Sequence, residues 1–306
     1  MIDFDDAVVV GIPVTIGFGE PTTRECMLLE GPQGWGEFSP PHDIDDRQAA
    51  RRLTAAVEPG TVGWPDPLRG RVPVAVAVPA VSPALAHRLV VDSGCRTADV
   101  AVGHSTLADD LARLEAVRDA LGPGGRIRCD AGGAWDADTA VSVIPELVRA
   151  ASELEFVTHP CATADDVAVV RRKVDVRVAA AVPSADVLVL DSAALGGVRR
   201  SLRVAEKSGL PCVVVAGLET SIGLSAAAAL AGVLPDLPFA CTIARPSWVA
   251  GDVVTTGRAM VATDGHLPVA PMPPAPESTL LAEYALTDAA ALTRWQRRLQ
   301  AARDAL

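Results

Sequence analysis

Several polar residues follow runs of apolar residues, and their types suit proton transfer and small-molecule binding. The acid–base candidates are Asp99, Asp130, His159 and Asp191, and the candidates for substrate binding are Glu219, Thr220, Ser221 and Arg245. A neutral imidazole accepts a proton near neutral pH, and a neighbouring carboxylate fixes its tautomer. We therefore expect His159 to form a proton-transfer pair with Asp130 or Asp191.

Alternating strands and helices from residue 71 onward predict parallel βα units. Strands are expected at 72–78, 97–102, 126–130, 156–158, 177–181, 187–190, 212–215 and 239–242. Eight such strands are typical of a (β/α) barrel, whose chemistry lies at the carboxyl ends of its strands. The candidate residues are therefore expected around one opening, the barrel mouth.

The rest of the chain predicts a second domain. We assign residues 1–69 to an α+β capping domain, 70–270 to the barrel and 271–306 to a C-terminal segment. That segment ends in a helix from Thr287 or Asp288 that packs back on the capping domain.

One connection is too short for a regular barrel. Only residues 182–185 separate the fifth and sixth expected strands. Parallel neighbours usually need a crossover of about a dozen residues, most often a helix. We therefore expect that the helix after the fifth strand is missing and that the barrel is irregular there.

Four segments carry a resemblance to a known family. They are Trp35-Gly36-Glu37-Phe38-Ser39-Pro40, Cys129-Asp130-Ala131-Gly132-Gly133, Leu195-Gly196-Gly197-Val198 and Gly217-Leu218-Glu219-Thr220-Ser221-Ile222-Gly223. Together they resemble actinobacterial o-succinylbenzoate synthases of the enolase superfamily. The resemblance implies an α/β fold, a modified (β/α) barrel with an N-terminal α+β capping domain completed by a C-terminal helix.

The family resemblance also implies a chemistry for which this chain lacks the residues. Family members bind Mg²⁺ through three carboxylates after strands three to five, and lysines after strands two and six assist a syn-dehydration. The lysine positions match Asp99, Ala101 and Asp191, and the metal positions match Asp130, Thr158 and the 181–182 segment. One carboxylate is too few to hold Mg²⁺ against water. We therefore expect no bound metal, no cofactor and no o-succinylbenzoate synthase activity.

Composition limits the partners. The net charge is −11, which argues against nucleic acid and anionic membrane surfaces, because both need basic patches. No apolar run reaches the ~18 residues of a membrane span, and the acidic start is unlike a signal peptide. We expect a cytoplasmic protein with a small-molecule ligand at the barrel mouth, and a homo-oligomer is left open.

Three classes of function remain. The preferred one is a metal-independent lyase, isomerase or cyclase that acts on a neutral, largely apolar small molecule in specialised metabolism. The alternative is a non-catalytic pseudoenzyme that serves as a binding or scaffold protein. An authentic Mg²⁺-dependent o-succinylbenzoate synthase is the least favoured.

Five of the candidate residues also have a structural interpretation. Asp130 is a type that caps backbone amides, Thr220 and Ser221 are types that begin a helix, and Asp99 and Asp191 are expected to pair with arginines such as Arg245. A new metal site built from the four acid–base candidates and a Cys161–His104 pair are further alternatives.

Overall fold

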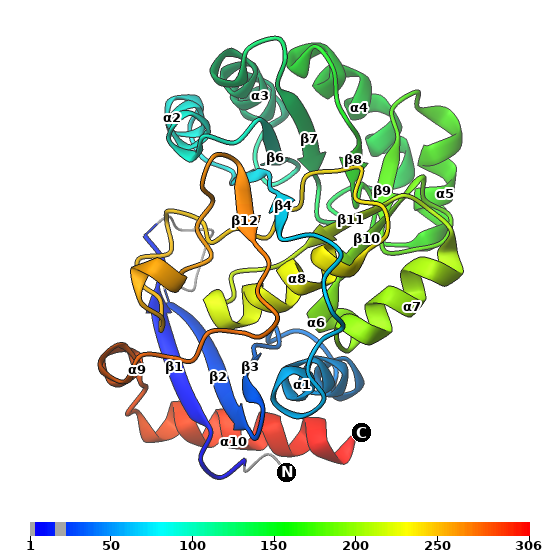
Figure 1. The fold of residues 1–306 in the computed structure, drawn as a ribbon. Coiled ribbons are helices and arrows are strands. Elements are labelled where there is room, and N and C mark those ends of the chain that lie inside the picture. The colour runs from blue at the N-terminus through cyan, green and yellow to red at the C-terminus, as the bar shows by residue number, and fades with distance from the viewer. Residues whose placement is uncertain (1–3, 16–22) are drawn as a thin grey trace.

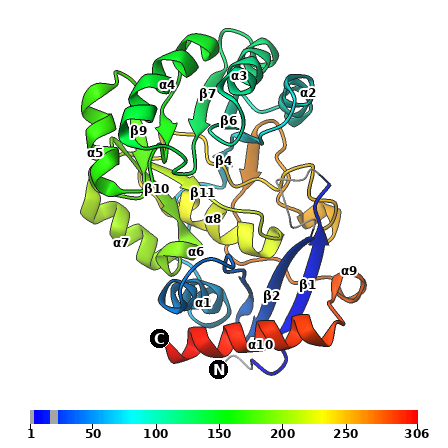
Figure 2. The same cartoon turned by 180° about the vertical axis from the view of Figure 1, so that it is seen from behind.

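The computed structural model describes residues 4–15 and 23–306, which form a capping domain and a barrel (Figure 1). The capping domain is an antiparallel sheet of β1 (Val8–Pro13), β2 (Thr23–Gly31) and β3 (Gly34–Phe38), in that order. Two helices, α1 (Asp46–Thr61) and α10 (Ala289–Asp304), cover it. Figure 2 shows α10 running beneath α1 and the sheet, so the two ends of the chain complete one domain.

Local sequence explains how these elements meet. Asp45 caps α1 in a reciprocal capping box with Gln48, and Asp288 caps α10. A side chain at Gly36 would meet the Ala56 carbonyl oxygen of α1 at 1.8 Å, so glycine is required for this close approach. Phe38 packs edge-to-face against Trp295 of α10, with ring centroids 6.1 Å apart. The C-terminal helix therefore packs on the capping domain, as predicted.

The barrel is built from parallel strands. Its sheet has the order β11 (Cys212–Val215), β10 (Val187–Asp191), β9 (Val178–Ala180), β8 (Val157–Thr158), β7 (Arg126–Asp130), β6 (Thr97–Ala101) and β5 (Val76–Val78). Isolated parallel bridges from Val74 to Cys241 and from Val215 to Thr242 join its two edges. The predicted eighth strand thus closes the barrel through single bridges instead of a continuous ladder.

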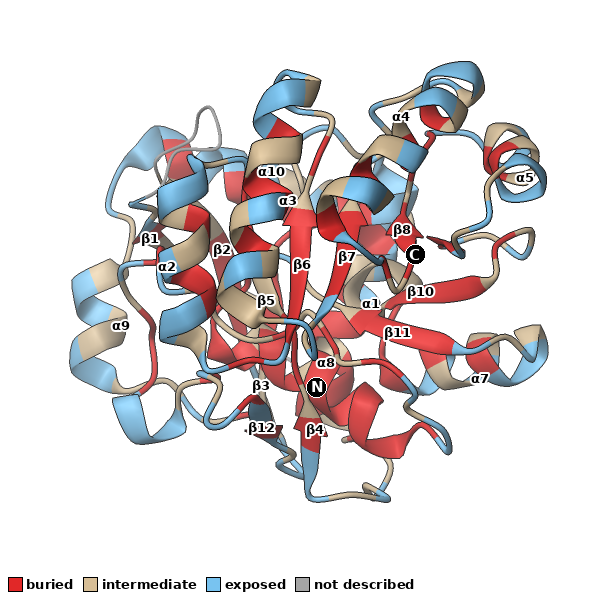
Figure 3. Cartoon of the chain, turned by 90° about the horizontal axis from the view of Figure 1, so that it is seen from above, coloured by how far each residue is buried: buried red, intermediate tan, exposed pale blue. Residues whose placement is uncertain are grey.

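Helices pack around the barrel with exposed faces outward and buried faces inward (Figure 3). They are α2 (Pro83–Ser93), α3 (Leu107–Leu121), α4 (Ala137–Ala151), α5 (Ala164–Lys173), the short α6 (Ser192–Leu195), α7 (Val198–Ser208) and α8 (Ser221–Val233). The alanine-rich α8 is almost wholly buried, because it contacts both the barrel and β3. Small side chains allow this close packing on two sides.

The remaining elements flank the barrel strands in the chain. β4 (Arg71–Pro73) pairs antiparallel with β12 (His266–Pro268). The 3₁₀ helix η1 (Thr256–Arg258) and α9 (Ser278–Tyr284) complete the chain before α10. Within the described residues, no helix is both long and apolar enough to cross a membrane.

The predicted loss of one helix is confirmed. β9 and β10 are adjacent and parallel, with Val187 opposite Ala179, and no helix stands between them. The direct connection is possible because β9 has only three residues, fewer than the five predicted at 177–181. Asp186 brings the chain back beside Val178, since their backbones share a hydrogen bond of 2.8 Å.

Candidate functional site

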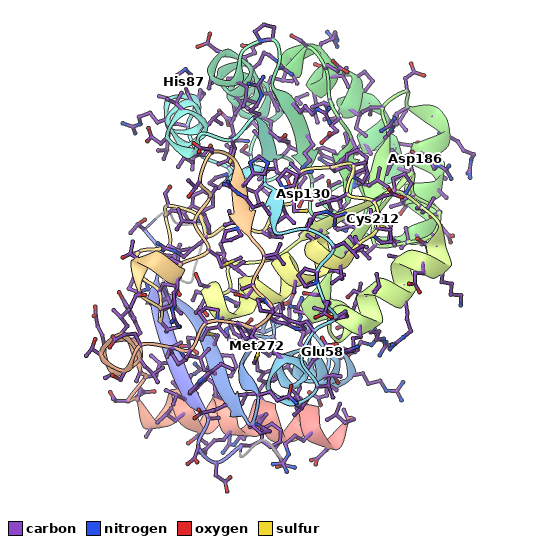
Figure 4. The ribbon with its side chains drawn as sticks, in the orientation of Figure 1. Glu58, His87, Asp130, Asp186, Cys212 and Met272 are labelled. Carbon is purple, nitrogen blue, oxygen red and sulfur yellow. The ribbon has the colours of Figure 1, made fainter. Side chains whose placement is uncertain are left out.

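Asp130 and His159 meet at the barrel mouth, at the ends of β7 and β8. The Asp130 Oδ1–His159 Nδ1 distance is 3.7 Å, and the side chains are 44% and 34% exposed. Figure 4 shows Asp130 within the barrel half of the molecule. Asp130 Oδ1 also accepts the Gly132 backbone N–H at 3.0 Å. The carboxylate therefore both orders its own loop and faces the imidazole.

The backbone holds His159 in a conformation that is rare for a non-glycine residue. Its φ is 43°, in the left-handed region. Its N–H donates to the Ala179 carbonyl and its own carbonyl accepts the Gly133 N–H. These two bonds to neighbouring segments fix the ring beside Asp130. Such strain, where the surroundings enforce it, is typical of functional positions.

Asp99 lies one layer below the mouth. Arg128, fully buried on β7, places its Nε 3.3 Å from Asp99 Oδ2. The same oxygen accepts the Thr242 hydroxyl at 2.6 Å, and Arg128 donates to that hydroxyl and to the Ala240 carbonyl. Burial raises the pKa of Asp99, while Arg128 opposes the rise and Asp130 adds to it. The pair fills the barrel interior over the Phe156 ring.

Asp191 at the end of β10 joins the two domains. Its Oδ2 accepts a hydrogen bond of 3.0 Å from Arg52 on α1, and its Oδ1 accepts the N–H groups of Ala193 and Ala194. The side chain thus both caps α6 and pairs with the capping domain. Asp99 and Asp191 do pair with arginines, as expected. Their partners are Arg128 and Arg52, and Arg245 pairs with neither.

Thr220 and Glu219 lie at the start of α8, where it meets the capping domain. Thr220 caps α8 and donates its N–H and hydroxyl to Glu37 Oε2 at 2.9 and 2.5 Å. Burial, and then repulsion from Glu219, raise the pKa of Glu37 to about 7. Burial also raises the pKa of Glu219, and Asp191 adds to that rise. Two carboxylates are therefore enclosed at the domain junction.

Ser221 and Arg245 brace the loop after the eighth expected strand. The Ser221 hydroxyl donates to Asp252 Oδ2 at 2.5 Å and accepts the Met260 N–H at 2.7 Å. Arg245 donates to the Val249 carbonyl at 2.6 Å, and its Nε is 3.5 Å from Asp252 Oδ2. These contacts tie the segment after residue 244 to α8.

Sequence reasoning missed the partners that hold these residues. They are Arg52, Arg128, Asp252, and the two interdomain carboxylates Glu37 and Glu58. Glu58 of α1 accepts the N–H groups of Val198 and Arg199 at the start of α7, and Figure 4 labels it at the domain junction. An arginine at the centre of the strand at 126–130 was a usable signal for Arg128, because a buried charge needs an opposite one.

The matches to family models follow this architecture. Residues 82–274 match the enolase C-terminal domain-like family and residues 9–60 match the enolase N-terminal domain-like family. A capping domain on a parallel barrel with a mouth at the strand ends defines the class. The chain belongs to the enolase superfamily.

Within that superfamily, the chain is similar to o-succinylbenzoate synthases. It is 46% identical to the one from Thermobifida fusca, over 96% of this chain and 95% of that protein. It is 36% identical to the one from Mycolicibacterium smegmatis, over 88% and 87%. The fold also matches the L-Ala-D/L-Glu epimerase of Bacillus subtilis with a TM-score of 0.74 at 20% identity, covering 89% of this chain and 96% of that one. These relatives are enzymes.

The residues at the mouth do not fit the magnesium site that the superfamily implies. Asp130 ends β7, Thr158 ends β8 and Ala181 follows β9, which gives one carboxylate among three positions. Across residues 4–15 and 23–306, no group of three or more His, Cys, Asp or Glu side chains is placed to hold a metal ion. Mg²⁺ prefers several oxygen ligands in near-octahedral geometry. The four-residue metal site considered from sequence is not formed.

The Cys161 alternative is also disfavoured. Cys161 is buried, and burial raises the pKa of its thiol to about 11. Only a thiolate is a strong nucleophile, so a raised pKa makes this cysteine inert near neutral pH. The backbone of Cys161 instead forms isolated β-bridges with Ala134 and Trp135 in the loop after β7.

Proposed function

We propose that the barrel mouth performs metal-independent acid–base catalysis of the lyase or isomerase kind on a small, largely apolar molecule. The observation that carries the proposal is the Asp130–His159 pair, 3.7 Å apart and open to solvent. Asp130 lies beside Nδ1, which leaves Nε2 of His159 to accept a proton. A positioned acid–base group contributes about 10²–10⁴ in rate.

The catalytic steps follow from these two side chains. His159 Nε2 takes a proton from the substrate, and the Asp130 carboxylate stabilises the imidazolium that forms. Return of the proton to a neighbouring atom gives an isomerase, and loss of a leaving group gives a lyase. Ala101, opposite Asp130 in the sheet, and Ala181, after β9, are small apolar residues at the same strand ends.

Isotope exchange tests the proposal without knowledge of the full reaction. The purified protein is incubated in D₂O with EDTA and a panel of small neutral carbonyl compounds, and C–H exchange is followed by NMR. Exchange above background that persists with EDTA and is lost in His159→Gln is expected. The control is His266→Gln, because the His266 side chain is exposed and its ring nitrogen contacts the Asp264 carbonyl. Exchange that EDTA abolishes, or that His159→Gln leaves unchanged, contradicts the proposal.

A non-catalytic binding protein is the second candidate. The observation that favours it is that Asp99 and Asp191 are held in ion pairs with Arg128 and Arg52, and so are not free to move protons. Saturable binding of a compound at the barrel mouth, with no C–H exchange in any compound of the panel, would favour this candidate.

A further inference from the structure

The charges at the barrel mouth are unevenly compensated. Arg128 neutralises Asp99 and Arg52 neutralises Asp191. Among the described residues, Asp130 has no arginine or lysine partner; its contacts are the Gly132 N–H and His159. One carboxylate at the mouth therefore keeps its negative charge open to a ligand.

A second acceptor atom lies below Asp130. Asp99 Oδ1 is buried and has no hydrogen-bond partner, although the other oxygen of the same carboxylate has two contacts. In the sheet register, Ala101 is opposite Asp130, so Asp99 lies two residues or about 7 Å deeper. The two carboxylates repel one another, since Asp130 is among the causes that raise the pKa of Asp99. A positive charge near both would relieve that repulsion.

Small residues occupy the strand ends near these acceptors. Ala101 is the last residue of β6, Ala181 follows β9, and Ala181 is exposed. Gly132 has a φ of +57°, and a side chain on it would meet His104 Nε2 at 3.3 Å. The positive φ favours glycine here, and His104 lies beside the loop that Asp130 orders.

We propose that the mouth binds a small molecule through a protonated amine that pairs with Asp130, above the unpartnered oxygen of Asp99. An ammonium group is a donor of hydrogen bonds only, which matches a site where acceptors are in excess. A carboxylate ligand would meet the charge of Asp130 without a compensating cation. This inference rests on the proposed function, because it names the head group that the same mouth takes.

Three probes with one apolar body test the charge preference. Benzylamine, benzyl alcohol and benzoate share a phenyl ring and differ in the charge of the head group. Binding is measured by NMR shift titration with EDTA present. Saturable binding of benzylamine alone is expected, and it should weaken when NaCl is raised, because exposed charges are screened. Benzoate binding as tight as benzylamine binding overturns the proposal.

Variants locate the binding. Asp130→Asn keeps an oxygen for the Gly132 N–H but removes the charge, and should weaken benzylamine binding about tenfold or more. Asp138→Asn makes the same charge change at a side chain that is 96% exposed, and should have no effect. Ala101→Lys places a cation in the mouth and should abolish binding. Equal affinity in Asp130→Asn and Asp138→Asn overturns the proposal.

The binding experiment tests the amine site and the exchange experiment tests acid–base catalysis, so either proposal can fail without the other. Binding is measured without turnover, so benzylamine binding in His159→Gln supports the amine site even where no exchange is found. Conversely, exchange that depends on His159, with no saturable benzylamine binding, overturns the amine site and leaves acid–base catalysis standing.

Discussion

Asp99 on β6 and Arg128 on β7 face each other inside the barrel, with 3.3 Å between Asp99 Oδ2 and Arg128 Nε. Both residues are buried, and Arg128 stacks over Phe156. A residue at a position where the family resemblance implies a catalytic lysine has thus become part of the barrel core. Its charge supports the fold, and the chemistry is left to groups nearer the solvent.

Replacing Asp99 with Ala should destabilise the fold strongly. Arg128 would stay buried with only the more distant Glu155, 3.8 Å from its Nη1, as a carboxylate partner, and breaking a buried pair from one side costs about 3–5 kcal/mol. Urea unfolding followed by circular dichroism measures the change. Asp138→Ala, at an exposed site, should change the free energy of unfolding by less than about 0.5 kcal/mol. If Asp99→Ala also lowered the free energy of unfolding by less than about 0.5 kcal/mol, the pair would not stabilise the barrel.

Much of the architecture was predictable because its signals are local. The helix α3 carries its own start and stop signals in the sequence, since it begins after the Thr106 cap and ends at Gly122. The short 182–185 connection predicted the missing helix from chain length alone. The eighth strand was less predictable, because it pairs only through single bridges at Cys241 and Thr242.

The candidate site was predictable as a set of positions and less so as a set of contacts. Strand ends placed Asp130 and His159 together, because neighbouring parallel strands end at one edge. Arg52 lies 139 residues from Asp191 in sequence, and Asp252 lies 31 residues from Ser221. No local sequence pattern predicts contacts over such separations. Pairings of that kind depend on tertiary packing.

Stability should depend on pH through Glu37. The carboxyl titrates near 4.5 in the unfolded chain and near 7 in the folded protein, because burial and Glu219 disfavour its charge. The folded state therefore holds the proton more tightly. The contribution to the free energy of unfolding is full below about pH 4.5 and is lost as the pH rises through 7.

The Glu37→Gln variant isolates this contribution. The difference in free energy of unfolding between wild type and variant should shift by up to about 3 kcal/mol from pH 5 to 8.5, with the wild type relatively weaker at high pH. Urea unfolding at several pH values measures it. Glu153→Gln, an exposed carboxyl, should give a flat difference. A flat profile for Glu37→Gln as well would mean that Glu37 is not held protonated.

Asp191 should contribute to the stability of the fold and not to the proposed catalysis. Asp191→Asn keeps an oxygen for the α6 cap but loses the charge opposite Arg52, which should cost about 1 kcal/mol. Asp191→Ala also removes the cap and should cost about 1 kcal/mol more. A double-mutant cycle with Arg52→Met measures the coupling by thermal unfolding. Exchange activity that disappears in Asp191→Asn, with the fold intact, would instead place Asp191 in the mechanism.

The purified protein should not perform the o-succinylbenzoate synthase reaction with added Mg²⁺. That chemistry needs a metal to stabilise an enediolate, and Thr158 and Ala181 offer no carboxylate beside Asp130. The assay is product formation with millimolar Mg²⁺, with the Thermobifida fusca relative as positive control. Conversion that depends on Mg²⁺ would show that the mouth assembles a metal site from ligands other than these.

Asp186 should be essential to the short connection between β9 and β10. Its Oδ2 accepts the Val178 N–H at 3.0 Å and its Oδ1 accepts from Arg171 at 2.6 Å. With no helix to pack on the sheet, these bonds hold the returning chain beside β9. Asp186→Ala leaves the Val178 N–H without its acceptor, so it should cost about 1–3 kcal/mol and speed hydrogen exchange at Val178. Asp175→Ala, an exposed neighbour in sequence, is the matched control. Unchanged protection of Val178 in Asp186→Ala would mean that the connection is held by apolar packing around Ala185 instead.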